Sequence, residues 1–83
     1  MITESEKKIL KRMHRLGLWG SNHMRLSNLV NTGYPSHLKG RVKTEIKELI
    51  KQNFVIYYNK EKQAVQLNSE KYSEIMRLIE DGN

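Results

Sequence analysis

The part of the sequence that decides the fold is residues 42–55, VKTEIKELIKQNFV. In its first half the apolar residues Val42, Ile46 and Leu49 return every three or four positions, which is the spacing of one face of an α-helix. Beyond Asn53 the pattern changes, because residues 54–58 are all β-branched or aromatic. The stretch therefore predicts a helix that passes almost directly into a β-strand.

Working back from this stretch, the helix is predicted to cover about residues 36–52, with Ser36 as its N-cap. One side of this helix is apolar and the opposite side is mainly basic. The apolar side consists of Leu38, Val42, Ile46, Leu49 and Ile50. Gly40 is unexpected here, because glycine inside a helix costs about 1 kcal/mol relative to alanine. Close approach of a partner or of the preceding helix would explain it, and so would a loose start of the helix.

Two shorter helices are predicted before this one. Thr3 and Glu6 have the spacing of a capping box, which places a helix over residues 4–16. A second helix is predicted over about residues 25–32, with Gly33 as the residue that follows its end.

After the long helix, two strand-like segments flank a polar turn at residues 59–63 and predict a β-hairpin. Tyr57 is expected on the strand face that points away from the core, where it would be available to a partner. A last helix is predicted over about 69–81 and is expected to stop at Gly82. Its apolar stripe consists of Tyr72, Ile75, Met76 and Ile79.

Composition limits what the chain can be. It has 83 residues, no Cys, and 15 Lys and Arg against 9 Asp and Glu, for a formal charge of +6. This length predicts one domain over residues 1–83, too small for a two-lobed enzyme cleft. Lys and Arg exceed the acids by four in residues 1–35 and again by four in residues 36–63, whereas acids exceed them by two in residues 64–83. A basic body with an acidic end indicates a polyanionic partner, most simply nucleic acid. The lack of a long apolar run predicts no contact with a membrane and a cytoplasmic location.

Two segments resemble a known family. Residues 24–33, MRLSNLVNTG, resemble a short first strand followed by the first helix and turn of a helix-turn-helix, and residues 42–55 resemble the recognition helix and following strand of winged-helix DNA-binding domains. Many members have Gly where this chain has Asn53, but Asn also tolerates the left-handed conformation. The resemblance implies an α+β, mostly α, winged helix-turn-helix fold with a three-helix core, a β-hairpin wing and an additional C-terminal helix. It places the helix-turn-helix at about residues 25–52 and the wing at about 54–68.

The resemblance also implies a function, that of small single-domain regulators of transcription in bacteria and archaea. The helix over about 36–52 would enter the major groove of double-stranded DNA, with the wing tip at 59–63 on the adjacent backbone. Arg41 and Lys47 are the best candidates for base contacts, and Thr44 could meet a thymine methyl group or a phosphate. The full set of candidate DNA-binding residues is Ser36, His37, Lys39, Gly40, Arg41, Lys43, Thr44, Lys47, Lys51, Lys60 and Lys62.

The sequence gives less support to functions other than DNA binding. No nucleophile, nucleotide-binding or metal-ligand pattern occurs, so we expect no enzyme, no cofactor, no metal site and no small-molecule ligand. An RNA-binding winged helix and a protein-interaction module within a larger complex remain alternatives. The helices over 4–16 and 69–81 are predicted to form a two-fold dimer interface, because Leu78 adds apolar surface that a monomer need not bury.

Overall fold

Helical and extended segments follow one another much as the apolar spacing predicts. A computed structural model describes residues 2–81. Its elements in chain order are α1 (Glu4–Arg15), β1 (Met24–Arg25), α2 (Leu26–Gly33), a 3₁₀ turn (Ser36–Leu38), α3 (Lys39–Lys51), β2 (Val55–Asn59), β3 (Ala64–Leu67), a second 3₁₀ turn (Ser69–Lys71) and α4 (Tyr72–Asp81). The chain is thus α+β and mostly helical, as predicted.

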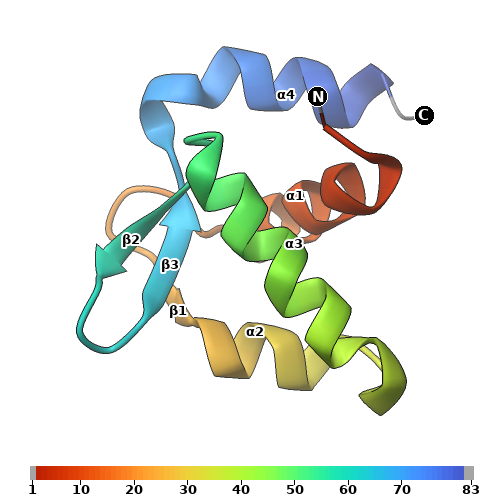
Figure 1. The fold of residues 1–83 in the computed structure, drawn as a ribbon. Helices are drawn as coiled ribbons and strands as arrows, with labels where there is room; N and C mark the ends of the chain where they lie inside the picture. The colour runs from red at the N-terminus through yellow and green to blue at the C-terminus, as the bar shows by residue number, and fades with distance from the viewer. Residues whose placement is uncertain (1, 82–83) are drawn as a thin grey trace.

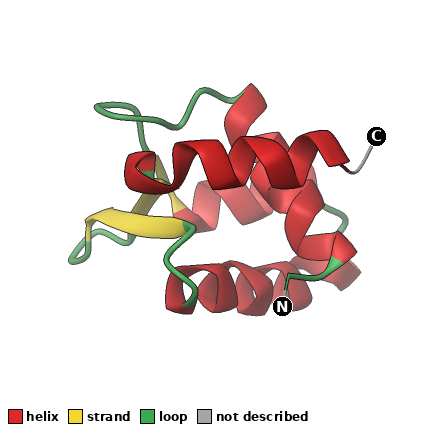
Figure 2. Cartoon of the chain, turned by 90° about the horizontal axis from the view of Figure 1, so that it is seen from above, coloured by secondary structure: helices red, strands yellow, loops and turns green. Residues whose placement is uncertain are grey.

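The strands form one antiparallel sheet in the order β1-β3-β2. Met24 and Tyr57 both lie opposite Val65, which places the short strand β1 and the hairpin strand β2 on either side of β3. In Figure 1, α4 lies along the top and α2 along the bottom, and α3 crosses diagonally between them. Figure 2 shows the strands gathered at one end of the molecule and the helices at the other.

The core lies between α1, α2, α3, α4 and the inner face of the sheet. Its fully buried large side chains are Leu10, Met13, Leu26, Leu29, Ile46, Leu49, Val55, Val65, Leu67 and Ile75. Trp19 connects two of the helices, because its Nε1 donates to His14 Nδ1 on α1 (3.1 Å) and its ring lies 5.1 Å from that of Tyr72 on α4.

Two local predictions are confirmed. Thr3 and Glu6 form the capping box, since the Thr3 amide donates to Glu6 Oε1 (2.8 Å) and the Glu6 amide donates to Thr3 Oγ1 (3.1 Å). Asn53 takes a left-handed conformation (φ 67°) between α3 and β2. Its carbonyl accepts a hydrogen bond from Asn68 Nδ2 (2.8 Å), which fixes this turn against the end of the hairpin.

The predictions for the end of α2 and for the start of α3 are wrong. Gly33 is the last residue of α2 and not the residue after it, and Tyr34 follows in an extended conformation (φ −138°). Ser36 does not cap α3, because Ser36–Leu38 forms a 3₁₀ turn and α3 begins only at Lys39. The Leu38 amide donates to the Pro35 carbonyl (3.0 Å), and this tighter bonding pattern replaces the first α-helical turn.

The prediction for Tyr57 is also wrong. Phe54 is buried, but it lies in the turn before β2 and not in the strand. The alternation of inward and outward side chains therefore starts at Val55, which faces inward. Tyr57 is therefore half-buried against the core. Tyr58 is the exposed tyrosine of β2, and its ring stacks on that of His23 with the ring centres 3.9 Å apart.

The C-terminal segment is helical, but its α-helix starts later than predicted. The 3₁₀ turn Ser69–Lys71 comes first, and Asn68 Oδ1 accepts a hydrogen bond from the Glu70 amide (3.1 Å). Leu78, expected to face a second copy, is half-buried against the chain's own core because α4 packs on α1. Gly82, the predicted helix stop, lies outside the described residues.

Candidate nucleic-acid interface

A groove lies between the start of α2, the start of α3 and the tip of the β2–β3 hairpin. Its volume is roughly 470 Å³. It is lined by Arg25, Leu26, Ser27, Val30, Asn31, Lys39, Gly40, Lys43, Lys62 and Gln63. Four of these ten described residues are basic and none is acidic, so cations from three separate parts of the chain converge on one concave surface.

Backbone contacts bring these distant segments together. The Leu26 amide donates to the Gln63 carbonyl (2.9 Å), which ties the start of α2 to the hairpin tip. Arg25 lies opposite Ala64 in the sheet, one residue before that contact. At the tip, Asn59 Oδ1 accepts from the Lys62 amide (3.0 Å) and Gln63 takes a positive φ of 54°. These bonds hold Arg25 and Lys62 at the same wall of the groove.

One side of α3 carries a row of lysines. Lys39, Lys43, Lys47 and Lys51 are four residues apart, so they lie on one face of the helix. At 1.5 Å per residue the row is about 18 Å long. Lys39 is half-buried and the other three are exposed. We call these four residues the lysine edge; its first two members line the groove and the others continue along α3 beyond it.

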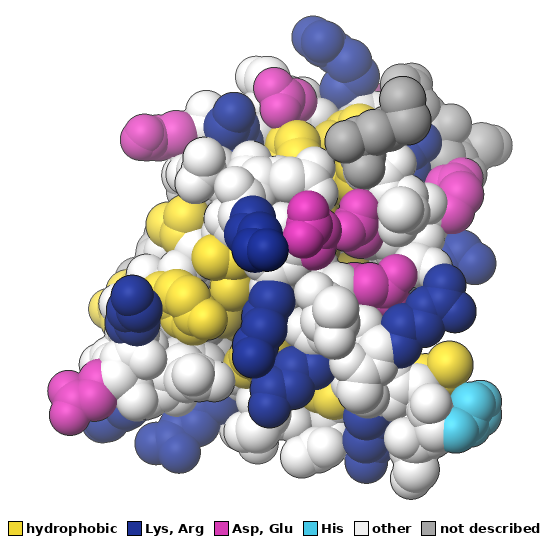
Figure 3. All heavy atoms as spheres, viewed as in Figure 1, with side chains coloured by type: hydrophobic (Ala, Val, Ile, Leu, Met, Phe, Trp, Pro, Cys, Tyr) yellow, Lys and Arg dark blue, Asp and Glu magenta, His cyan; other side chains and the backbone are white. Residues whose placement is uncertain are grey.

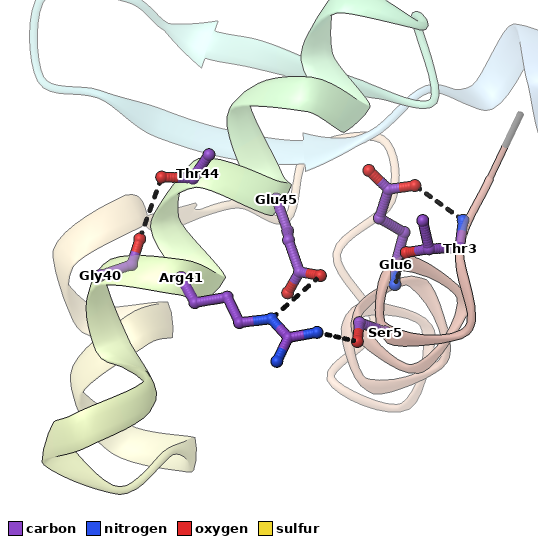
Figure 4. Close-up of polar contacts among 7 residues, drawn as sticks. All are labelled: Thr3, Ser5, Glu6, Gly40, Arg41, Thr44 and Glu45. Atoms are coloured by element: carbon purple, nitrogen blue, oxygen red, sulfur yellow. Dashed lines mark hydrogen bonds and ion pairs between the residues drawn. The ribbon is translucent and has the colours of Figure 1, made fainter.

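The other side of α3 faces α1 and is partly acidic. Arg41, Glu45 and Glu48 share this side, which we call the mixed edge. Figure 4 shows Arg41 reaching toward α1, where its Nε lies 3.8 Å from Glu45 Oε2 and its Nη2 donates to Ser5 Oγ (3.4 Å). The Arg41 side chain is 67% exposed and that of Glu45 is 16% exposed. An ion pair between residues four apart on a helix contributes only about 0.3–0.5 kcal/mol, but it directs Arg41 away from the groove.

Gly40 and Thr44 lie between the two edges. A Cβ built on Gly40 would have nothing within 4 Å, so contact with α2 does not explain this glycine. The Thr44 hydroxyl donates to the Gly40 carbonyl (3.1 Å), and Figure 4 shows this side chain pointing away from Arg41. This part of α3 therefore offers bare backbone and a methyl-bearing side chain.

The structure brings together only some of the candidates from the sequence. Lys39, Gly40, Lys43 and Lys62 line the groove. The other candidates are exposed but do not line the groove: Ser36, His37, Arg41, Thr44, Lys47, Lys51 and Lys60. The sequence reasoning missed Arg25, Ser27, Asn31 and Gln63. The sequence indicated only the short strand that was predicted near Met24. The pairing of this strand with β3, which brings Arg25 to the groove, is seen only in the structure.

The charge distribution on the surface agrees with this description. In Figure 3, Lys and Arg side chains form a band over α3 and the lower part of this face, whereas most Asp and Glu side chains lie in the upper half. The upper half is the α4 side of the molecule in the same view. The excess of basic residues thus gathers on the side that carries the groove.

Within the described residues, no three His, Asp or Glu side chains come close enough to hold a metal ion. None of the described helices is both long and apolar enough to cross a membrane. Comparison of the chain with protein-family models, with curated proteins and with solved structures gives no match.

Proposed function

We propose that this chain binds double-stranded DNA through the groove and the lysine edge of α3. The observation that carries the proposal is the convergence of Arg25, Lys39, Lys43 and Lys62 on a groove whose described lining contains no carboxylate. Phosphate groups are the ligands that such a surface attracts, and release of their counterions supplies most of the binding free energy.

The arrangement of the elements supports duplex DNA as the polyanion. The exposed side of α3 stands between α2 and a β-hairpin, and a single helix fits the major groove of duplex DNA. This order is compatible with the winged-helix fold that the sequence resembles, with the hairpin as the wing. In that arrangement Lys60 and Lys62 at the tip would contact the flanking backbone.

A role in regulating transcription is part of the same proposal and rests on the resemblance. The cytoplasmic location belongs to it as well and rests on the lack of a long apolar run in the sequence. The predicted homodimer through α1 and α4 belongs here too, although Leu78 now offers it less surface. Leu16, directly after α1, and Tyr72, at the start of α4, are 43% and 51% exposed and are side chains that a second copy could cover. The mass of the protein at high micromolar concentration tests this part, and a monomer there would contradict it.

The DNA-binding proposal is tested by titrating labelled duplexes with the protein at several salt concentrations. If five to seven phosphates are neutralised, log K should fall against log salt with a slope of about −5 to −6. Lys43→Glu should lower affinity for every duplex. Arg77→Glu is the matched control, since it changes the net charge equally but lies on the exposed side of α4.

Double-stranded RNA and single-stranded DNA of the same length complete the experiment. Tighter binding to RNA, or binding that Lys43→Glu does not weaken, would contradict the proposal. A lack of affinity for every nucleic acid at physiological salt would instead favour the protein-interaction alternative.

A further inference from the structure

The two edges of α3 differ in charge and in the direction of their side chains. The lysine edge carries four cations, and its first two members line the groove beside Arg25. The mixed edge carries one cation and two carboxylates, and its arginine is paired toward α1. A phosphate strand that approaches α3 is therefore attracted along one edge and repelled by the carboxylates of the other.

The side chains available on α3 are suited to phosphates and poorly suited to base edges. Lysine is a flexible point charge that suits phosphates, whereas the planar fork of arginine and the amides of Asn and Gln bind base edges with a fixed two-point geometry. Within α3, Arg41 is the only arginine and there is no Asn or Gln. Thr44, the remaining polar side chain between the edges, already donates its hydroxyl proton to the Gly40 carbonyl.

From this, and resting on the proposed DNA binding, we infer that the lysine edge binds the phosphates of one strand and that α3 positions the duplex without reading its sequence. The row of about 18 Å follows the backbone from the groove toward the end of the helix. Arg41 stays on the side facing α1 and does not contact bases. The side chains in the groove that carry a planar fork or an amide come from α2 and its preceding residue and from the hairpin tip: Arg25, Asn31 and Gln63. We assign the reading of bases to these three.

Two alanine variants on the same helix separate the edges. Lys47→Ala and Arg41→Ala each remove one exposed cation, so their effects on net charge are equal. Each is titrated against two duplexes: the one most enriched by selection from a random pool with the unaltered protein, and a scrambled duplex of the same composition. Circular dichroism confirms that both variants fold.

We expect Lys47→Ala to lower affinity by the same factor for both duplexes and to make the salt slope less steep by about 1. Arg41→Ala should change either affinity by less than about twofold, because it removes no phosphate contact. A drop in the ratio between the two affinities with either variant would overturn the inference, because α3 would then be reading sequence. Failure of the unaltered protein to bind any duplex at about 50 mM salt would instead overturn the proposed function, and the inference with it.

Discussion

The guanidinium of Arg12 occupies the space that a side chain on Gly33 would need. Its Nη1 donates to the Leu29 carbonyl (2.8 Å), its Nη2 donates to Thr32 Oγ1 (3.2 Å), and its Cζ lies 5.1 Å from the centre of the Tyr34 ring. One arginine of α1 thus binds the last turn of α2 and the residue after it. Because α2 forms one wall of the groove, this contact inside the fold also helps to position the candidate interface.

Gly33→Ala should therefore destabilise the protein, although alanine normally favours a helix. The new methyl group would displace a guanidinium held by two hydrogen bonds, at an expected cost of about 1–3 kcal/mol. Urea unfolding measures this cost. In an Arg12→Ala background the methyl group has room, so the same change should become neutral or favourable. An equal cost in both backgrounds would contradict the role given to Arg12.

Gln66 gives a second prediction, because it is a buried amide with two defined acceptors. It is 7% exposed, and its Nε2 donates to the carbonyls of Gly20 (2.6 Å) and Asn22 (3.0 Å). Gln66→Met removes both hydrogen bonds at similar size and should cost about 1–2 kcal/mol. Gln66→Glu should cost more at neutral pH, because a carboxylate cannot donate and would face two carbonyl oxygens.

The pH dependence of the Gln66→Glu variant provides its control. When the introduced carboxyl is protonated it regains one O–H donor, so the difference in unfolding free energy from the unaltered protein should shrink as the pH falls. The difference for Gln66→Met should stay constant over the same range. If the differences in unfolding free energy from the unaltered protein change with pH in the same way for both variants, the hydrogen bonds to the Gly20 and Asn22 carbonyls are not the cause of the effect.

Much of the fold could be predicted because its signals are local. The capping box depends on two residues three apart, Thr3 and Glu6, and the turn at Asn53 depends on that residue's own tolerance of positive φ. What failed depends on contacts between distant segments. The space beside Gly33 is filled by the side chain of Arg12, 21 positions earlier in the chain. No pattern in the sequence around the glycine indicates this contact.

The same distinction applies to the candidate site. The basic side of α3 was visible in the sequence, since helical spacing alone places Lys39, Lys43 and Lys47 together. Arg25 was missed because its position in the groove depends on the pairing of β1 with β3. The pairing of Arg41 with Glu45 is an i,i+4 contact within one helix and could be expected from the sequence. The contact of Arg41 with Ser5 could not, because Ser5 belongs to another helix.

Trp19 offers a prediction about how α1 and α4 are held together. Its Nε1 donates to His14 Nδ1, and its ring contacts that of Tyr72. Trp19→Phe keeps an aromatic ring but removes the donor, so we expect a loss of about 1 kcal/mol, or roughly 4–8 °C in Tm for a domain of this size. Circular dichroism measures it, because Trp19 is the only tryptophan and its fluorescence is lost. In a His14→Phe background the same change should cost only the difference in ring size, and a full loss there would rule out the hydrogen bond as its cause.

At Gly40, one substitution is expected to affect the stability of the fold and the binding of DNA in opposite directions. A Cβ there has open space around it, so Gly40→Ala should raise the free energy of unfolding by about 0.5–1 kcal/mol through helix propensity alone. A loss of stability in urea unfolding would show that the space around Gly40 is not open.

The same variant also tests why glycine is present, because Gly40 lines the proposed DNA groove. If a phosphate approaches the backbone there, the more stable variant should bind duplex DNA several-fold more weakly, whereas unchanged affinity would mean that Gly40 only loosens the start of α3. We expect the weaker binding, because Lys39 and Lys43 on the same turn of the helix draw the strand toward this point.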